Sequence, residues 1–376
     1  MTPSVFKAGY LPGLNDADVT WHRLSMGAPD APLQVDVPQL SAAQMTALAE
    51  RVRKASHAHL KTMCVSDIVR VLDKATARLL DAKDIYRQQL ERLLPQATGF
   101  DAEMVRLNLN AYLQTFRGLQ LQRFVAEDFA NPKVLDEFQP RTQGGWTRAF
   151  GPELLVHVWA GNVPALPMWS FVSGLLVKAG SIGKVSSAEP VFATLFAQLL
   201  AEVEPLWADC FAVVWWPSGA GHEHTAFALA DVVLAYGGNE ALQAMQTHIP
   251  VTTRFLPHGH KLSLGMVSKA ALSVRKGPGV ARQAALDVAR YDQQGCYSPH
   301  VFYVQRGAQL SPQDFAQHLA NELAVLQHKL PRRVLSLEEA AQVGAWREAH
   351  ELTALNGDTP TVLGSHANLS TVVYSD

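Results

Sequence analysis

Residues 154–164 have the sequence Leu-Leu-Val-His-Val-Trp-Ala-Gly-Asn-Val-Pro. The first six residues form a nearly continuous apolar run, which is typical of a strand that is buried on both faces. Turn residues then end the strand, and an apolar helical pattern follows to about Val177. A buried strand that turns directly into a buried helix is the first half of a βαβ unit, so this stretch predicts a parallel sheet.

The same alternation continues along the chain. Further strands are predicted at 181–185, 211–215, 232–236 and 253–256, with helices at 191–203, at 225–230 and from Asn239 onward. We therefore expect a Rossmann-type α/β fold, in which ligands bind at the carboxyl ends of the strands. Those ends carry Gly161-Asn162, Ser186-Ser187, Ser218-Gly219-Ala220-Gly221 and Gly237-Gly238-Asn239.

The flanking regions have other patterns. Residues 1–40 are rich in Pro, Gly and Asp and predict an irregular arm. Ser41 and Gln44 form a capping box that begins a helix, and helical spacing continues to Leu94, where Pro95 is expected to end it. The remaining predictions are a helix at 101–124, strands at 262–267, 301–304 and 371–374, and a helix from Ser311 with Asp314 as its capping partner.

Composition excludes several classes of protein. The 376 residues are 48% hydrophobic and 18% charged, and the net charge is −2, so charge gives no case for nucleic-acid binding. Three distant cysteines form neither a disulfide framework nor a metal motif. The longest apolar tract, 166–179, is too short to cross a membrane, and the first residues lack an export signal, so we expect a cytoplasmic protein without membrane insertion.

One cysteine stands at a junction between elements. The sequence Tyr-Asp-Gln-Gln-Gly-Cys-Tyr-Ser-Pro-His at 291–300 follows a helical pattern and precedes an apolar strand. Gly295 leaves one flank of the Cys296 sulfur free of bulk, and Pro299 stops any helix, so the thiol is placed where scaffolds expose reactive groups. The alternative is that Cys296 is a small buried hydrophobe.

Three other motifs carry polar groups. Lys184, at the end of a buried strand, needs an anionic partner such as a ribose-phosphate unless it reaches solvent. Gly219 and Gly221 offer a backbone nest for phosphate without a GxGxxG pattern. Asn162 is suited to hold an oxyanion, or simply caps its turn. The run His222-Glu223-His224 lacks HExxH spacing and a nearby third ligand, so we expect no metal site.

Taken together, residues 147–304 resemble the aldehyde dehydrogenase superfamily, and within it the LuxC-like acyl-CoA reductases, the fatty-acid reductases of bacterial bioluminescence. Gly161-Asn162-Val163-Pro164 is similar to the turn that carries the family's oxyanion-hole asparagine. Lys184 matches the lysine that contacts the adenosine ribose, and Gly237-Gly238 resembles the pyrophosphate turn. Cys296 then matches the nucleophile. The small Ser187, with Ser186 beside it, leaves room for a 2′-phosphate, which implies NADP(H) in preference to NAD(H).

Two departures from the family pattern are informative. Ser263 stands where aldehyde-oxidising members carry a glutamate base, so hydrolysis of an acyl-enzyme should be slow and reduction is favoured. Only eighty residues follow Cys296, so the resemblance implies that a C-terminal part is missing or that the domain is built from a shorter segment. The expected domains are 1–262, a helical region with an NAD(P)-binding domain, and 263–376, a catalytic domain.

The resemblance implies an activity and its partners. Cys296 would form a thioester with the acyl group of an acyl-CoA or another activated donor, with Asn162 at the oxyanion, and NADPH would reduce that thioester to an aldehyde. A homo-oligomer and an acyl-activating partner enzyme are also implied. The alternatives are a cysteine acyltransferase or acyl carrier without redox chemistry, and a nucleotide-binding subunit with an inert Cys296.

Overall fold

The chain divides into two compact units, each described here by itself. The computed structural model describes residues 5–27, 30, 32–217, 219, 221–355, 360–364 and 370–376. The first unit comprises Met1–Thr98 and Arg106–His260, and the second comprises Gly99–Val105 and Lys261–Asp376. The assignment of the first unit to cofactor binding and of the second to catalysis remains a prediction.

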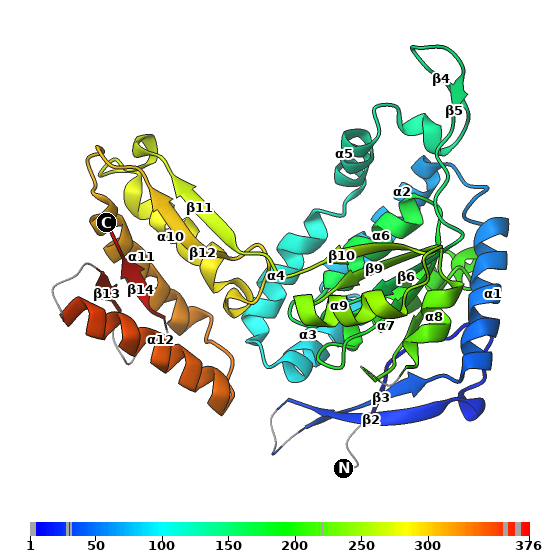
Figure 1. Ribbon diagram of the computed structural model, residues 1–376, viewed down its shortest axis with the longest axis horizontal. Helices are drawn as coiled ribbons and strands as arrows, with labels where there is room; N and C mark the ends of the chain where they lie inside the picture. Colours follow the sequence, from blue (N-terminus) through cyan, green and yellow to red (C-terminus); the bar gives the residue numbers. More distant parts are fainter. Residues whose placement is uncertain are drawn as a thin grey trace. The chain divides into compact units, whose positions relative to one another are not determined.

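The first unit is built on a five-stranded parallel sheet (Figure 1). Its order is β10–β9–β6–β7–β8, with β6 at Leu154–Val158, β7 at Gly180–Lys184, β8 at Phe211–Val214, β9 at Val232–Tyr236 and β10 at Arg254–His258. The chain first moves outward from β6 through β7 to β8, and then returns to pair β9 with the other side of β6. This confirms the predicted α/β fold and places a topological switch point between β6 and β9.

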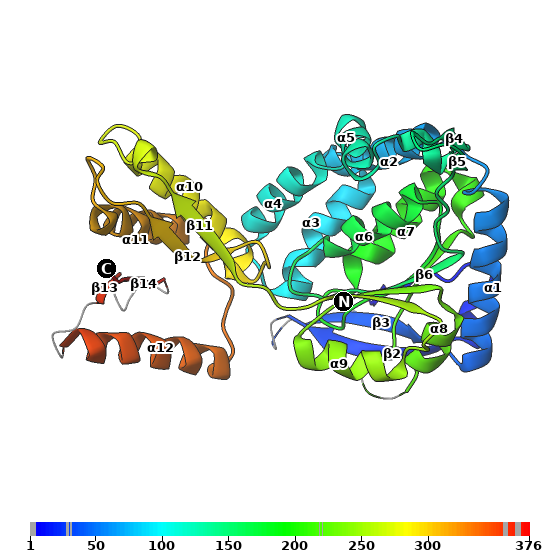
Figure 2. The same ribbon diagram turned by 45° about the horizontal axis from the view of Figure 1, so that its top comes forward.

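Helices cover both faces of this sheet (Figures 1 and 2). On one face, α1, α8 and α9 pack against the apolar side chains of the strands. On the other face lie α6 and α7, with α2 and α3 packed against α7. The first unit contains α1 (Ala42–Ala58), α2 (Val65–Leu80), α3 (Ile85–Thr98), α5 (Gly118–Asp128), α6 (Leu166–Leu176), α7 (Val191–Val203), α8 (Glu223–Leu229) and α9 (Asn239–His248). Helix α4 (Ala102–Gln114) begins in the segment Gly99–Val105 of the second unit and continues in the first.

Close packing of Trp159 against Gly183 determines the path of the chain just after β6. The indole of Trp159, just after β6, lies where a Cβ on Gly183 would stand, at 1.8 Å from the nearest ring carbon. Only glycine is compatible with that packing. Trp159 and the imidazole of His157 both contact the hydroxyl of Ser170 in α6, so the strand and its helix are joined by buried polar contacts.

The amino-terminal predictions need three corrections. Residues 1–40 are not an irregular arm, because β1 (Phe6–Lys7), β2 (Thr20–Met26) and β3 (Leu33–Gln39) form a three-stranded sheet. The alternating Leu33, Val35 and Val37 are all buried, and that period of two is a strand signal. Two short strands, β4 (Gln139–Pro140) and β5 (Trp146–Thr147), pair further along the chain.

The other two corrections concern helix ends. Helix α3 passes through Pro95 to Thr98, since a proline removes one donor and the buried Leu93, Leu94 and Ala97 still hold the last turn. The predicted helix at 101–124 is two helices, α4 and α5. The break is stabilised by Asp73, whose carboxylate accepts hydrogen bonds from the Gly118 backbone N–H at 2.7 Å and from Arg117 Nε at 2.6 Å.

The second unit centres on a pair of parallel strands, β11 (Ser263–Val267) and β12 (Pro299–Val304). Helix α10 (Gly277–Ala289) connects the strands, and α11 (Pro312–Lys329) packs beside α10 over a shared apolar core. The capping box of Ser311 and Asp314 is confirmed at the start of α11. The remaining elements are α12 (Leu337–Leu355) and the antiparallel strands β13 (Thr361–Leu363) and β14 (Val372–Tyr374). Within the described ranges, no helix has both the length and the apolar character needed to cross a membrane.

Candidate active site

The carboxyl edge of the sheet brings several predicted residues together in the first unit. The turns at Gly161-Asn162 and Gly237-Gly238 follow β6 and β9, which pair directly through Val158 and Ala235. These are the two strands at the switch point, where open parallel sheets form a ligand crevice. A Cβ on Gly161 would stand 2.7 Å from the Ser186 hydroxyl, so this turn also lies against the loop after β7. Asn162 is exposed on that turn.

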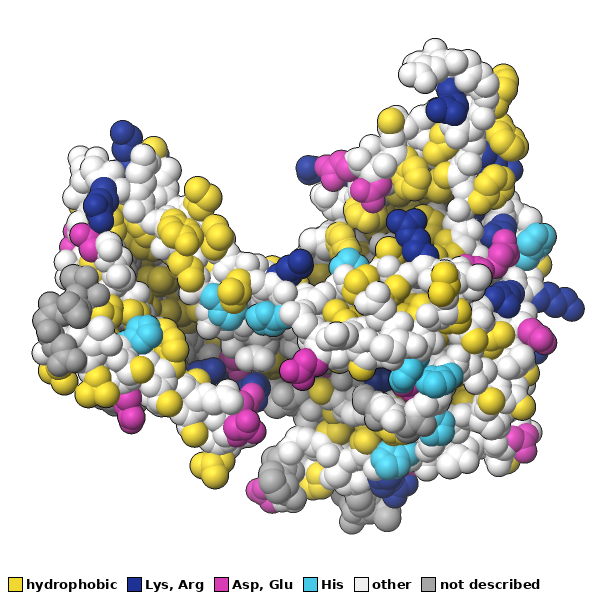
Figure 3. All heavy atoms as spheres, viewed as in Figure 1, with side chains coloured by type: hydrophobic (Ala, Val, Ile, Leu, Met, Phe, Trp, Pro, Cys, Tyr) yellow, Lys and Arg dark blue, Asp and Glu magenta, His cyan; other side chains and the backbone are white. Residues whose placement is uncertain are grey.

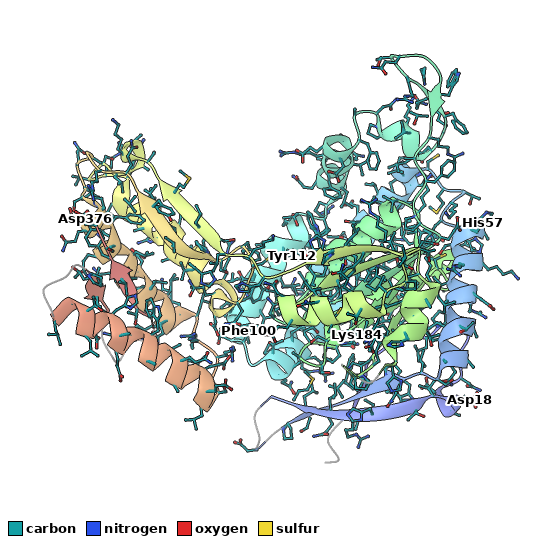
Figure 4. The ribbon with its side chains drawn as sticks, in the orientation of Figure 1. Asp18, His57, Phe100, Tyr112, Lys184 and Asp376 are labelled. Carbon is teal, nitrogen blue, oxygen red and sulfur yellow. The ribbon has the colours of Figure 1, made fainter. Side chains whose placement is uncertain are left out.

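Lys184 ends β7 and is 8% exposed (Figure 4). Burial lowers the pKa of its ammonium group, while the nearby Glu223 carboxylate acts in the opposite direction. Among the described residues, Lys184 has no hydrogen bond or ion pair. A largely buried cation without a direct partner is energetically costly, and an anionic ligand at this edge would relieve that cost.

The residues that follow Lys184 have distinct contacts. The Ser186 hydroxyl accepts a hydrogen bond from the Ala188 backbone, and the exposed Ser187 accepts one from Trp215 Nε1 at 2.9 Å. Glu189 was not singled out from the sequence. Its carboxylate accepts 2.8 Å hydrogen bonds from the backbone of Val191 and Phe192 at the start of α7. Burial raises the pKa of Glu189 to about 7. Glu189 thus caps a helix and leaves Ser187 as the exposed polar side chain of this loop.

Two glycine pairs were expected to bind phosphate. Gly219 and Gly221 both have a φ of +75° and have open space around them, but Ser218 and Ala220 lie outside the described residues. Gly238 is the N-cap of α9, has no side-chain cap, and a Cβ there would meet nothing within 4 Å. The backbone N–H groups that begin α9 are therefore open to an anionic ligand.

Cys296 lies in the second unit, on an exposed loop immediately before β12. Three consecutive residues ahead of it, Tyr291, Asp292 and Gln293, have φ angles of +48°, +53° and +66°. Left-handed backbone is unfavourable for residues that carry a Cβ, and such strain concentrates at functional sites. Asn162 belongs to the first unit, and its role at the oxyanion remains a prediction.

Polar contacts hold this strained segment. Asp292 is buried, which raises the pKa of its carboxyl, and it accepts a 3.0 Å hydrogen bond from the Arg333 backbone N–H. Gln293 Nε2 donates to the Pro299 carbonyl at 2.9 Å, so this bond spans the cysteine. Ser263 Oγ donates to the Cys296 carbonyl at 2.5 Å. Ser263, which was predicted only as the substitute for a glutamate, therefore anchors the loop that carries the thiol.

The histidines differ in how deeply their side chains are buried. His157 is fully buried in β6, and burial lowers its pKa to about 3, so its imidazole stays neutral at physiological pH. His258, His260 and His300 are all exposed, and His258 stacks on Tyr236 at 4.9 Å between ring centroids.

The second unit also contains a cavity of about 1230 Å³, and the hollow is visible in Figure 3. Gln293 and Gln294, which precede Cys296 by three and two residues, contribute to its lining. Its apolar wall includes Phe302 of β12 and the α11 residues Phe315, Leu319, Leu323 and Leu326. Ligand pockets commonly measure about 300–1,000 Å³. The cavity is therefore large enough for an extended apolar ligand.

The fold defines the class of protein. The chain resembles aldehyde dehydrogenase KauB from Pseudomonas aeruginosa with a TM-score of 0.72, over 98% of this chain and 74% of that chain, at 15% identity. Aldehyde dehydrogenase 21 from Physcomitrella patens gives a TM-score of 0.69, over 99% of this chain and 76% of that chain, also at 15% identity. This is an aldehyde-dehydrogenase-like fold. The buried Lys184, the α9 terminus and the switch-point crevice offer a cation, backbone N–H groups and space, which fit a nicotinamide dinucleotide.

Sequence similarity identifies the family. Residues 60–376 match the model of the acyl-CoA reductase (LuxC) family, and the chain belongs to that family. It is 30% identical to the long-chain acyl-protein thioester reductase of Aliivibrio fischeri, over 68% of this chain and 53% of that protein. The corresponding protein of Vibrio harveyi is 24% identical over 76% of this chain and 59% of that protein. The chain thus spans about half the length of the curated relatives it matches.

Proposed function

We propose that this chain catalyses reduction of a long-chain acyl thioester to an aldehyde through an acyl group on Cys296. The observation that carries the proposal is the exposed Cys296 on a strained and anchored loop, in a chain that belongs to the acyl-CoA reductase family. The donor is acyl-CoA or an acyl-protein thioester. Both present the same reacting group, a thioester carbonyl.

The first step is transfer of the acyl group. The Cys296 thiolate attacks the thioester carbonyl carbon, a new C–S bond forms, and the bond to the donor sulfur breaks, so that the donor leaves as a thiol after taking up a proton. Gln293 and Ser263 hold the loop on both sides of Cys296 and so limit the orientations of its sulfur. The Cys296 backbone N–H supplies one donor to the developing oxyanion, and the family resemblance implies Asn162 as a second.

The second step is reduction. The carbonyl carbon of the Cys296 thioester accepts the hydride that a nicotinamide cofactor would supply when bound. Collapse of the resulting thiohemiacetal breaks the C–S bond, releases the aldehyde and restores the thiol. Ser263 has no carboxylate with which to activate water, so the thioester survives until it is reduced.

The first unit binds the cofactor. Lys184 binds the ribose-phosphate, and the α9 terminus at Gly238 binds the pyrophosphate. We propose NADPH, because Ser187 is small, neutral and exposed and Glu189 is turned inward to cap α7, so neither side chain opposes a 2′-phosphate. The apolar cavity of the second unit receives the hydrocarbon tail of the acyl group.

The test starts with the purified chain and radiolabelled palmitoyl-CoA, without cofactor. The label should appear on the peptide that contains Cys296, with release of one CoA per adduct. Addition of NADPH should then convert the label to aldehyde. Cys296→Ala should abolish both steps. Cys64→Ser is the matched control, because Cys64 is the other exposed cysteine of the described residues.

Each outcome has a definite meaning. An adduct on Cys64, or full aldehyde formation by Cys296→Ala, rejects the proposed nucleophile. An adduct on Cys296 that passes to other thiols or amines but never consumes NADPH or NADH identifies an acyl carrier. The same assay with NADH in place of NADPH tests the cofactor preference, and a lower KM for NADH would overturn that part.

A further inference from the structure

Three potential metal-ligating side chains meet in the first unit. Glu223 and His224 begin α8, and His248 is the last residue of α9. One ligand atom from each of the three lies within 4.8 Å of the other two. His248 Nδ1 is 3.2 Å from a Glu223 carboxylate oxygen, and the rings of His224 and His248 have centroids 4.3 Å apart. The packing of α8 beside α9 therefore supplies the third ligand that is absent from the local sequence.

The carboxylate of Glu223 gives independent support for a ligand. The Glu223 side chain is 9% exposed, yet its Oε2 is buried without a hydrogen-bond partner among the described residues. A desolvated carboxylate oxygen without a donor is unfavourable. Lys184 is an electrostatic neighbour of Glu223, but no described hydrogen bond joins the two. A cation held between the carboxylate and the two imidazoles would supply the missing partner.

We propose that Glu223, His224 and His248 form a binding site for a divalent transition-metal ion of the zinc type. Two imidazoles and one carboxylate are a ligand set that zinc accepts, whereas calcium and magnesium prefer oxygen ligands alone. Donors around a tetrahedral zinc lie about 3.3–3.5 Å apart. The three donors, which lie within 4.8 Å of one another, would have to move closer together to reach that spacing.

The surroundings of the site favour an open coordination shell. His224 is exposed and His248 is half-buried, so solvent can reach the metal from their side. Figure 3 shows histidine side chains gathered on the face of the first unit that carries α8 and α9. Three protein ligands and a water would complete a four-coordinate ion. Such an ion would tie the start of α8 to the end of α9 and would stabilise the folded first unit by mass action.

The experiment uses the whole chain without an affinity tag, stripped of metal by EDTA. Zinc chloride is titrated in competition with a chromogenic chelator, and thermal unfolding is followed with and without zinc. We expect one zinc per chain and a rise in Tm that EDTA reverses. His248→Ala and Glu223→Gln should each weaken binding at least about tenfold, because even loss of a supporting contact costs that much.

His222→Ala is the matched control. His222 is adjacent in sequence but outside the cluster, with Nε2 placed 3.1 Å from Gln39 Nε2, so its removal should leave zinc affinity unchanged. Because Glu223 is buried, its variant could fail to fold. The exposed His224→Ala then serves in its place, with the same expected loss. Equal zinc affinity in wild type, His248→Ala and His224→Ala would overturn the proposal, as would weak binding of several ions that His222→Ala reduces equally.

Discussion

The left-handed segment before Cys296 gives a prediction that separates stability from activity. Gln293 has a φ of +66°, and its side chain donates to the Pro299 carbonyl across the cysteine. Gln293→Ala and Gln293→Gly both lose this hydrogen bond, which contributes about 0.5–1.5 kcal/mol. Of the two, only Gln293→Gly also removes the cost of left-handed backbone at a residue with a Cβ, about 1–2 kcal/mol. The greater conformational freedom of glycine in the unfolded chain offsets about 0.5–1 kcal/mol of that gain. Gln293→Gly should therefore be more stable than Gln293→Ala by about 0.5–1 kcal/mol.

Activity should follow the opposite order. Without the hydrogen bond from Gln293 to Pro299, the Cys296 loop adopts more orientations, and glycine at position 293 increases their number further. Single-turnover acylation should therefore slow by about tenfold to a hundredfold, most in Gln293→Gly. Stability is measured by urea unfolding, and acylation by rapid mixing with labelled palmitoyl-CoA. Gln309→Ala is the control, since it also removes a hydrogen bond between a glutamine side chain and the backbone, which the Val274 N–H donates to Gln309 Oε1 outside the loop. Equal stability of the two Gln293 variants, together with unchanged acylation, would refute the reasoning.

Three further predictions concern the remaining site residues. Ser263→Glu should raise the ratio of free acid to aldehyde several-fold by activating water at the thioester, while Ser263→Ala should not. The ratio is measured by chromatography of the products, and an unchanged ratio in Ser263→Glu contradicts the proposal. Lys184→Met keeps the buried stem and should raise the KM for NADPH about tenfold to a hundredfold with a smaller change in kcat, so an unchanged KM argues against a cofactor contact. Glu189 has a pKa raised from 4.5 to about 7, so its contribution to stability is present below pH 4.5 and is lost as pH rises through 7. The Tm of Glu189→Gln relative to wild type should then increase between about pH 5 and about pH 8, and a difference independent of pH would contradict this assignment.

The sheet could be predicted because its strands carry their own signal. The strands around Val156, Ile182 and Val213 are buried on both faces, and each is followed by turn residues, which is the pattern of a parallel sheet covered by helices. The amino-terminal sheet was missed because Pro, Gly and Asp dominate the composition there, although Leu33, Val35 and Val37 alternate. The composition of this segment obscured the alternation of apolar residues that indicates a strand.

Burial and long-range contacts account for what the sequence could not provide. Glu189 and His157 look like ordinary polar residues in the sequence, and only complete burial shifts their pKa values. Glu189 had a weaker signal, since it lies two residues before α7 and negative charge near the start of a helix is favoured by the helix dipole. His248 had none, because it is twenty-four residues from His224 and meets it only through the packing of two helices. The strain before Cys296 likewise depends on Asp292 and Arg333, which lie far apart in the sequence.

The segment Gly99–Val105 has a consequence for how this protein can be divided. It belongs to the second unit, although the chain on either side of it belongs to the first. Phe100 (Figure 4) packs edge-on against Tyr291, 5.4 Å between ring centroids, at the beginning of the left-handed segment. A fragment that starts at Lys261 would lack Phe100, so Tyr291 would lose its aromatic neighbour beside the cysteine loop. Recombination at one crossover therefore cannot exchange the second unit intact, and expression of the halves as separate polypeptides would require this seven-residue piece to be grafted onto the second.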